Sequence, residues 1–147
     1  MYYSRNTVRK LLEEYLHSEE TINFSKYCKY YYGEQIFGRS ASMWVAEYIQ
    51  NAKDYLSTVT MATFIEHKKC MAWRIRYLAE KEGFSLADKK NSLALLEGSD
   101  YIMGLGIKYN VSKNDAIKNR LVDKIHCINQ AESELIEYTL TSMAVEK

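Results

Sequence analysis

The sequence predicts an all-α fold in a single domain. The chain has 147 residues, no proline and 6 glycines, whereas β-sandwiches and barrels need frequent Gly and Pro turns. Long stretches repeat apolar residues at the three-to-four-residue spacing of a helical face. We therefore expect one compact domain over residues 1–147, built from six or seven helices and ending in a long C-terminal helix.

The first half of the chain begins with a clear amphipathic pattern. Val8, Leu11 and Leu16 lie on one helical face, so a helix is expected to begin near Asn6 or Thr7. Residues 21–39 are ambiguous, because helical spacing and a high density of aromatic residues coexist there. A short helix from Asn23 or Ser25 to Tyr32, terminated by Gly33, is the favoured interpretation, and a small hairpin is the alternative.

Two further helices are predicted before residue 84. Ser40 or Ser42 can cap the first of them, and its apolar stripe runs to residue 56. The next four residues are poor helix formers and offer a new cap. The second helix is therefore expected from about Met61 to Glu82, with Gly83 as the left-handed residue at its end.

The second half predicts two short helices and one long one. The short helices are expected to end at Glu97 and Tyr109, each near glycines. Ser112 and Asp115 then resemble a capping box, and the chain continues without Gly or Pro to about Ala144. A helix of about thirty residues spans about 45 Å, which favours a projecting, dimerising arm over residues 123–145. A break near residue 131, where the apolar face thins, is the competing possibility.

Composition excludes several classes of function. The net charge is +1, so the whole chain is not a polyelectrolyte. The 3 cysteines are too few and scattered for a disulfide framework, which favours reduced thiols and a cytoplasmic location. Neither a secretory signal nor a membrane span is visible. No nucleophile motif or phosphate-binding loop is found either, so we expect no enzymatic activity and no cofactor.

A metal site is one alternative, and it is not the favoured one. His67 and Cys70 lie three residues apart on one helix, and His126 or Cys127 could add a ligand of the kind that zinc prefers. Adjacent residues on a helix point about 100° apart, so His126 and Cys127 cannot easily join one site. Ordinary packing is the preferred interpretation, and no metal is predicted.

Residues 101–122 can be interpreted as a helix-turn-helix for DNA binding. The first helix would end at Tyr109, and the second would begin after Ser112, with Gly106 and Ala116 at the close crossing. Lysine, arginine and asparagine are residue types that hold phosphates or base edges. The predicted DNA-binding residues are Ser112, Lys113, Asn114, Lys118, Asn119 and Arg120, with Lys68, Lys69 and Arg74 from a second basic stretch.

The run Tyr109-Asn110-Val111-Ser112 followed by Ala116 resembles the turn of small bacterial and phage helix-turn-helix regulators. The resemblance implies a regulator of phage or mobile-element type that binds duplex DNA as a homodimer on two half-sites. This is the first functional hypothesis.

The alternative hypothesis is a protein-binding module without a nucleic-acid role, such as a phage accessory or inhibitor protein that docks on a host protein. Its contact surface would be the tyrosines of the stretch 26–32, since tyrosine is a favoured interface residue. Those residues are Tyr27, Tyr30, Tyr31 and Tyr32.

Overall fold

The computed structural model describes residues 3–19, 36, 38–86 and 89–144, and within these ranges every regular element is a helix. The predicted all-α class is therefore confirmed. The described residues form five helices, fewer than the six or seven expected: α1 (Arg5–His17), α3 (Gly38–Asn51), α4 (Thr58–Glu82), α5 (Lys89–Ser112) and α6 (Asp115–Ala144). The predicted helix or hairpin within 21–39 falls mostly outside the described residues.

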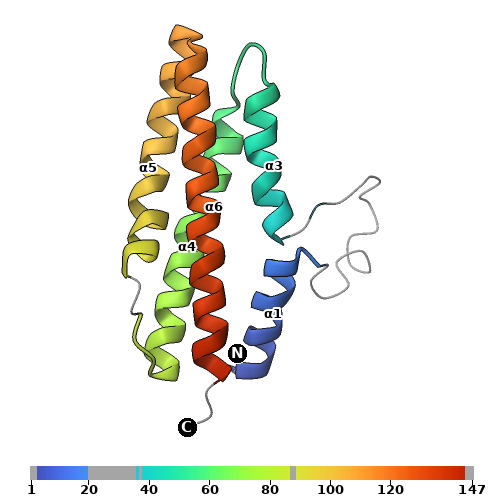
Figure 1. Ribbon diagram of the computed structural model, residues 1–147, viewed down its shortest axis with the longest axis vertical. Coiled ribbons are helices and arrows are strands. Elements are labelled where there is room, and N and C mark those ends of the chain that lie inside the picture. Colours follow the sequence, from blue (N-terminus) through green and yellow to red (C-terminus); the bar gives the residue numbers. More distant parts are fainter. Residues whose placement is uncertain (1–2, 20–35, 37, 87–88, 145–147) are drawn as a thin grey trace.

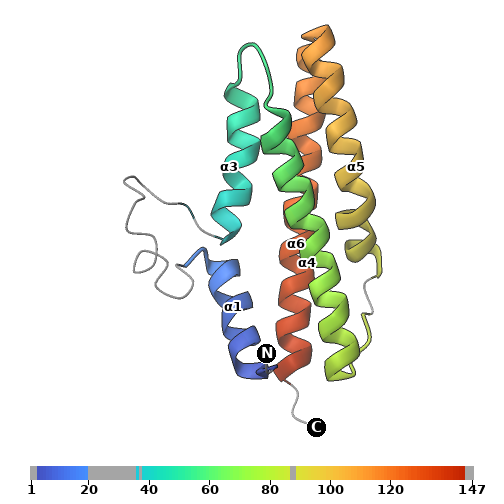
Figure 2. The same ribbon diagram turned by 180° about the vertical axis from the view of Figure 1, so that it is seen from behind.

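The helices form a four-cornered up-down-up-down bundle in which two shorter helices share one corner (Figure 1). α1 and α3 follow one another along the same direction and together occupy the first corner, and α4, α5 and α6 occupy the other three. Seen from behind, α4 lies between α5 and the corner shared by α1 and α3 (Figure 2). Both short connections, between α3 and α4 and between α5 and α6, lie at the same end of the bundle.

Local sequence explains where α1 and α4 begin and end. The hydroxyls of Ser4 and Ser57 cap the two N-termini by accepting from the backbone N–H three residues on. Ser18 and Gly83 end the helices in the left-handed conformation, with φ of 61° and 70°. The predicted apolar face of α4 is buried throughout, from Met61 to Ala79.

The glycines of α5 do not end a helix, so the predicted division into two short helices is wrong. Gly98 lies where a Cβ atom would come within 3.1 Å of Ile128 on α6, and Gly106 packs against Met61 on α4. These two glycines allow neighbouring helices to approach closely. The helix continues through both glycines although each costs it roughly 1 kcal/mol relative to alanine.

The long C-terminal helix is confirmed, but it does not project from the bundle. Its apolar residues are buried inside the same chain along its whole length, from Leu121 to Met143. The helix runs without a break through Ala131. The segment 123–144 therefore offers no free apolar face for the predicted dimerising arm, and a homodimer stays a prediction.

Candidate functional site

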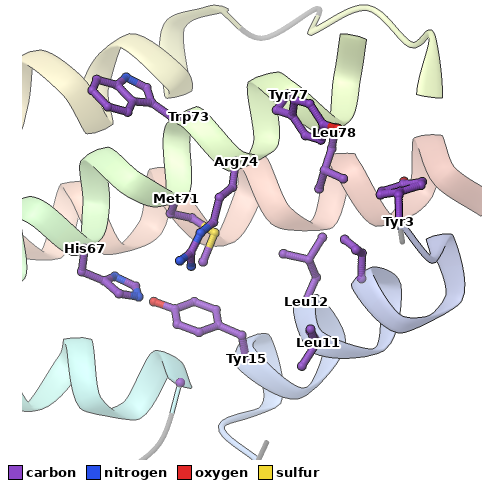
Figure 3. Close-up of a pocket in the computed structure, with 12 residues that line it drawn as sticks. Tyr3, Leu11, Leu12, Tyr15, His67, Met71, Trp73, Arg74, Tyr77 and Leu78 are labelled. Carbon is purple, nitrogen blue, oxygen red and sulfur yellow. The ribbon is translucent and has the colours of Figure 1, made fainter. Parts of the chain in front are cut away.

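The candidate site is an open groove between α1 and α4, which we call the α1–α4 groove. Among the described residues, no Cα atom of α1 lies within 8 Å of one of α4. The space between the two helices has a volume of about 710 Å³ and is mostly apolar. It is lined from α1 by Val8, Leu11, Leu12 and Tyr15, and from α4 by His67, Met71, Trp73, Arg74, Tyr77 and Leu78, together with Tyr3 and Gly38 (Figure 3).

Side chains connect the two helices at both ends of the groove. At one end Tyr3 donates to Glu82, and Arg5 Nε lies 3.2 Å from Glu82 Oε2. At the other end the rings of Tyr15 and His67 stack, with centroids 5.5 Å apart. A second pocket of about 490 Å³ begins beyond this stacked pair, between α3 and α4. The groove is thus held at its ends and open between them.

A buried ion pair lies beside the stacked pair. Lys68 of α4 is fully buried and donates to Glu132 Oε2 of α6, whose side chain is also buried. The Tyr15 hydroxyl donates to the same oxygen over 2.8 Å, and Lys68 also donates to the Ser42 hydroxyl over 2.9 Å. Four helices therefore meet in one polar cluster, formed by Tyr15, Ser42, His67, Lys68 and Glu132.

The cluster controls the protonation of its members. Burial and the Glu132 carboxylate raise the pKa of Tyr15, so its hydroxyl keeps the proton that it donates. Burial lowers the pKa of Lys68, and the carboxylate of Glu132 opposes that shift. Burial also lowers the pKa of His67, again opposed by Glu132, so the imidazole is neutral at pH 7.

One oxygen of the buried carboxylate lacks a hydrogen-bond donor. Glu132 Oε1 is inaccessible to solvent and makes no hydrogen bond in the described structure, and His67 Nδ1 lies 3.8 Å from it. Buried polar groups are nearly always paired, so this oxygen favours a proton on Nδ1. The other imidazole nitrogen is then left for the groove.

The predicted DNA-binding residues do not form one surface. Ser112, Lys113, Asn114 and Lys118 lie at the end of the bundle where α5 meets α6, whereas Lys68, Lys69 and Arg74 lie along α4. Lys68 is buried in the polar cluster, so its predicted role as a free cation is wrong. Lys69 pairs with Asp100 over 2.8 Å, and Arg74 lines the α1–α4 groove.

The structure also corrects the predicted turn. Ser112 is the last residue of α5, and its hydroxyl donates to the carbonyl of Lys108. Asn114 caps α6 by accepting from the backbone N–H of Ala116. Val111 is 83% exposed and does not pack on the next helix. α5 and α6 form a long antiparallel hairpin, unlike the open crossing of a helix-turn-helix.

The lysines near this turn bind the chain itself. Lys113 donates to the carbonyl of Asp54, and Lys118 to that of Ala52. Asn110 holds the same connection between α3 and α4 by bonding both backbone groups of Leu56. Arg120 donates to the Tyr101 hydroxyl, and Asn119 is exposed. The predicted protein-binding tyrosines, 27 and 30–32, lie outside the described residues.

Neither the groove nor the polar cluster is predicted from the sequence, although the sequence contains one signal for the cluster. Lys68 occupies an apolar position of the α4 stripe, between Ile65 and Met71, and Glu132 does the same on α6, between Ile128 and Leu135. Opposite charges that interrupt two buried faces indicate a buried pair. The groove itself left no such signal, because its side chains form an ordinary amphipathic pattern.

Comparison with known proteins gives no match: neither a family model, nor a curated protein, nor a solved structure corresponds to the chain. Two findings concern only the described residues. None of their helices has the length and apolar character that crossing a bilayer requires. No three of their His, Cys, Asp or Glu side chains come together as a metal site would need.

Proposed function

We propose that this protein is a helical protein-binding module whose α1–α4 groove receives an apolar segment of a partner protein. The observation that carries the proposal is the open groove itself. No described Cα atom of α1 lies within 8 Å of one of α4, and the two helices leave an apolar space of about 710 Å³ between them. An additional amphipathic helix is the kind of occupant that such a groove accepts.

The rim of the groove supports recognition of a protein. Trp73 is 63% exposed and Tyr77 is 57% exposed, and both line the same pocket as Leu11 and Leu78. Tryptophan and tyrosine are the residues most enriched among those that dominate binding energy at interfaces. Partly exposed aromatic side chains next to an apolar floor are therefore what a partner segment would cover.

DNA binding stays a prediction and has less support. DNA binding requires Lys113 and Lys118 as free phosphate ligands, but both donate to backbone carbonyls of the α3–α4 connection. A cation already engaged in this way must give up those bonds before it contacts a phosphate. The proposal for a regulator of phage type rests on the sequence pattern alone.

Site-directed photocrosslinking tests the proposed function. The photoreactive residue p-benzoylphenylalanine replaces Tyr77 on the groove rim, or Tyr101 on α5 as the matched control, since both tyrosines are about half exposed. The two variants are irradiated in extracts of the cells that produce the protein. The photoreactive residue at position 77 is expected to give a discrete crosslinked protein, and the one at position 101 is expected to give none. Equal crosslinking from both positions would contradict a specific groove.

A second pair of variants separates groove binding from a loss of folding. Leu11→Glu places a charge in the groove, whereas Ile107→Glu places the same charge on the exposed side of α5. Both variants are checked for helical content and thermal unfolding. Loss of the position-77 crosslink with Leu11→Glu alone supports the proposal, and its persistence would contradict it.

A further inference from the structure

One end of the α1–α4 groove is cationic, and no described carboxylate pairs with its arginine, Arg74. The Arg74 side chain extends from α4 toward His67 and Tyr15 (Figure 3). No described acidic side chain lies within ion-pairing distance of it, whereas the buried Lys68 is paired with Glu132. Arg39 adds a further positive charge near the Tyr15 hydroxyl. The rest of the groove wall is apolar.

We propose that Arg74 and His67 form a carboxylate-binding subsite, which holds an acidic side chain of the partner segment while its apolar side chains lie along α1 and α4. This inference rests on the proposed function. It specifies the chemistry of the partner segment, which is apolar and places one carboxylate at the end of the groove nearest α3. Arginine suits this role because its planar guanidinium matches a carboxylate with two parallel hydrogen bonds.

The unpartnered oxygen of Glu132 supports a role for His67. With a proton on Nδ1 the imidazole faces Glu132 Oε1, at a present separation of 3.8 Å. A second proton on the other nitrogen would then be donated to a carboxylate in the groove. The ring would lie between two carboxylates, one buried in the protein and one supplied by the partner.

The charges around His67 favour this uptake of a proton. The charges of Glu132 on α6 and of Lys68 and Arg74 on α4 act on the ring, against which the Tyr15 ring of α1 stacks. Without an occupant the two cations outnumber the single carboxylate, and burial keeps the pKa of His67 low. An added carboxylate would offset the excess positive charge and raise that pKa.

A partner segment fits the groove better than a free fatty acid does. Pockets for small molecules enclose most of the ligand surface. Here the rim residues Trp73 and Tyr77 are more than half exposed, so the outer side of a lone acyl chain would stay in water. A segment attached to a folded partner brings its own surface to cover that side.

Three small probes that share one apolar chain test the subsite. Decanoate, 1-decanol and decyltrimethylammonium are titrated into the full chain carrying Trp44→Phe, so that the emission of Trp73 reports on the groove. A charge-assisted hydrogen bond contributes about 1.5–3 kcal/mol, so decanoate is expected to bind at least about tenfold more tightly than decanol. Decyltrimethylammonium is expected to bind most weakly.

Matched variants assign the preference to the named residues. Arg74→Gln should abolish the preference for decanoate over decanol, whereas Arg76→Gln, on the exposed side of α4, should preserve it. In the parent protein the preference for decanoate over decanol should increase as the pH is lowered from 8 to 6, because His67 takes up a proton. His67→Gln should remove that increase.

The outcomes that contradict the carboxylate subsite differ from those that contradict the groove. Equal binding of decanoate and decanol would overturn the carboxylate subsite and leave the apolar groove intact. A preference that persists with Arg74→Gln would also overturn it. Failure of all three probes to change the emission of Trp73 would instead contradict the groove on which the proposed function rests.

Discussion

Lys68 and Glu132 form an ion pair in which both side chains are removed from water. Removing two charges from water costs several kcal/mol per ion, and their mutual attraction repays this only when other hydrogen bonds complete the arrangement. Tyr15 and Ser42 supply such bonds. The ion pair therefore joins α4 to α6, and through its bond to the Tyr15 hydroxyl it positions Tyr15 at the end of the groove.

Removal of one partner is expected to destabilise the protein strongly. Lys68→Met leaves Glu132 buried without its cation, and breaking a buried pair in this way typically costs about 3–5 kcal/mol. The double variant Lys68→Met/Glu132→Gln should recover at least half of that loss, because no uncompensated charge remains. Urea unfolding measures both values. A single variant as stable as the parent would show that the two charges are not paired in the folded protein.

His67 is expected to make stability depend on pH. Its pKa is lower in the folded protein than the ordinary value of 6.5, so below pH 6.5 the unfolded chain binds more protons than the folded chain. Stability should therefore fall as the pH decreases from about 7.5 through 6.5 toward 5. In His67→Gln this part of the decrease should be absent. Thermal unfolding over that pH range provides the comparison, and identical profiles would refute the assignment.

Among the elements, α5 gives the clearest test of how glycines act in this fold. A Cβ atom at Gly106 would lie 2.2 Å from Met61 Sδ, whereas nothing lies within 4 Å of a Cβ atom at Gly104. Gly104→Ala should therefore stabilise the protein by up to about 1 kcal/mol through helix propensity. Gly106→Ala should give a less stable protein than Gly104→Ala, because the end of the fully buried Met61 side chain must move to make room for the added methyl group. Denaturant unfolding of the pair provides the test, and equal effects would contradict the packing of α4 on α5.

The same residues show what the sequence could and could not predict. The apolar face of α4, the cap at Gly83 and the length of α6 follow from local patterns and were predicted. The continuity of α5 depends on contacts of Gly98 and Gly106 with α6 and α4, which no local pattern contains. The groove depends on the distance between α1 and α4. Local sequence patterns contain no information on that distance, so they do not predict the groove.

For the whole molecule, the two functional hypotheses predict different responses to duplex DNA. If the lysines at the α5–α6 turn serve the fold, mixed duplexes should give no salt-sensitive mobility shift. A shift that disappears in a folded Lys113→Glu/Lys118→Glu variant would instead support the DNA-binding prediction. Thermal unfolding of that variant is needed beside it, because both side chains also hold the α3–α4 connection.

The proposed function requires that the space between α1 and α4 is an open apolar site. Methyl NMR during titration with 1-decanol tests it most directly, because this probe carries no charge. Methyl signals of Leu11, Leu12, Met71 and Leu78 should shift in a saturable manner, while those of Leu121, Ile125 and Leu135 in the closed core should not. Signals that do not move, or that move equally in the groove and the core, would contradict the claim.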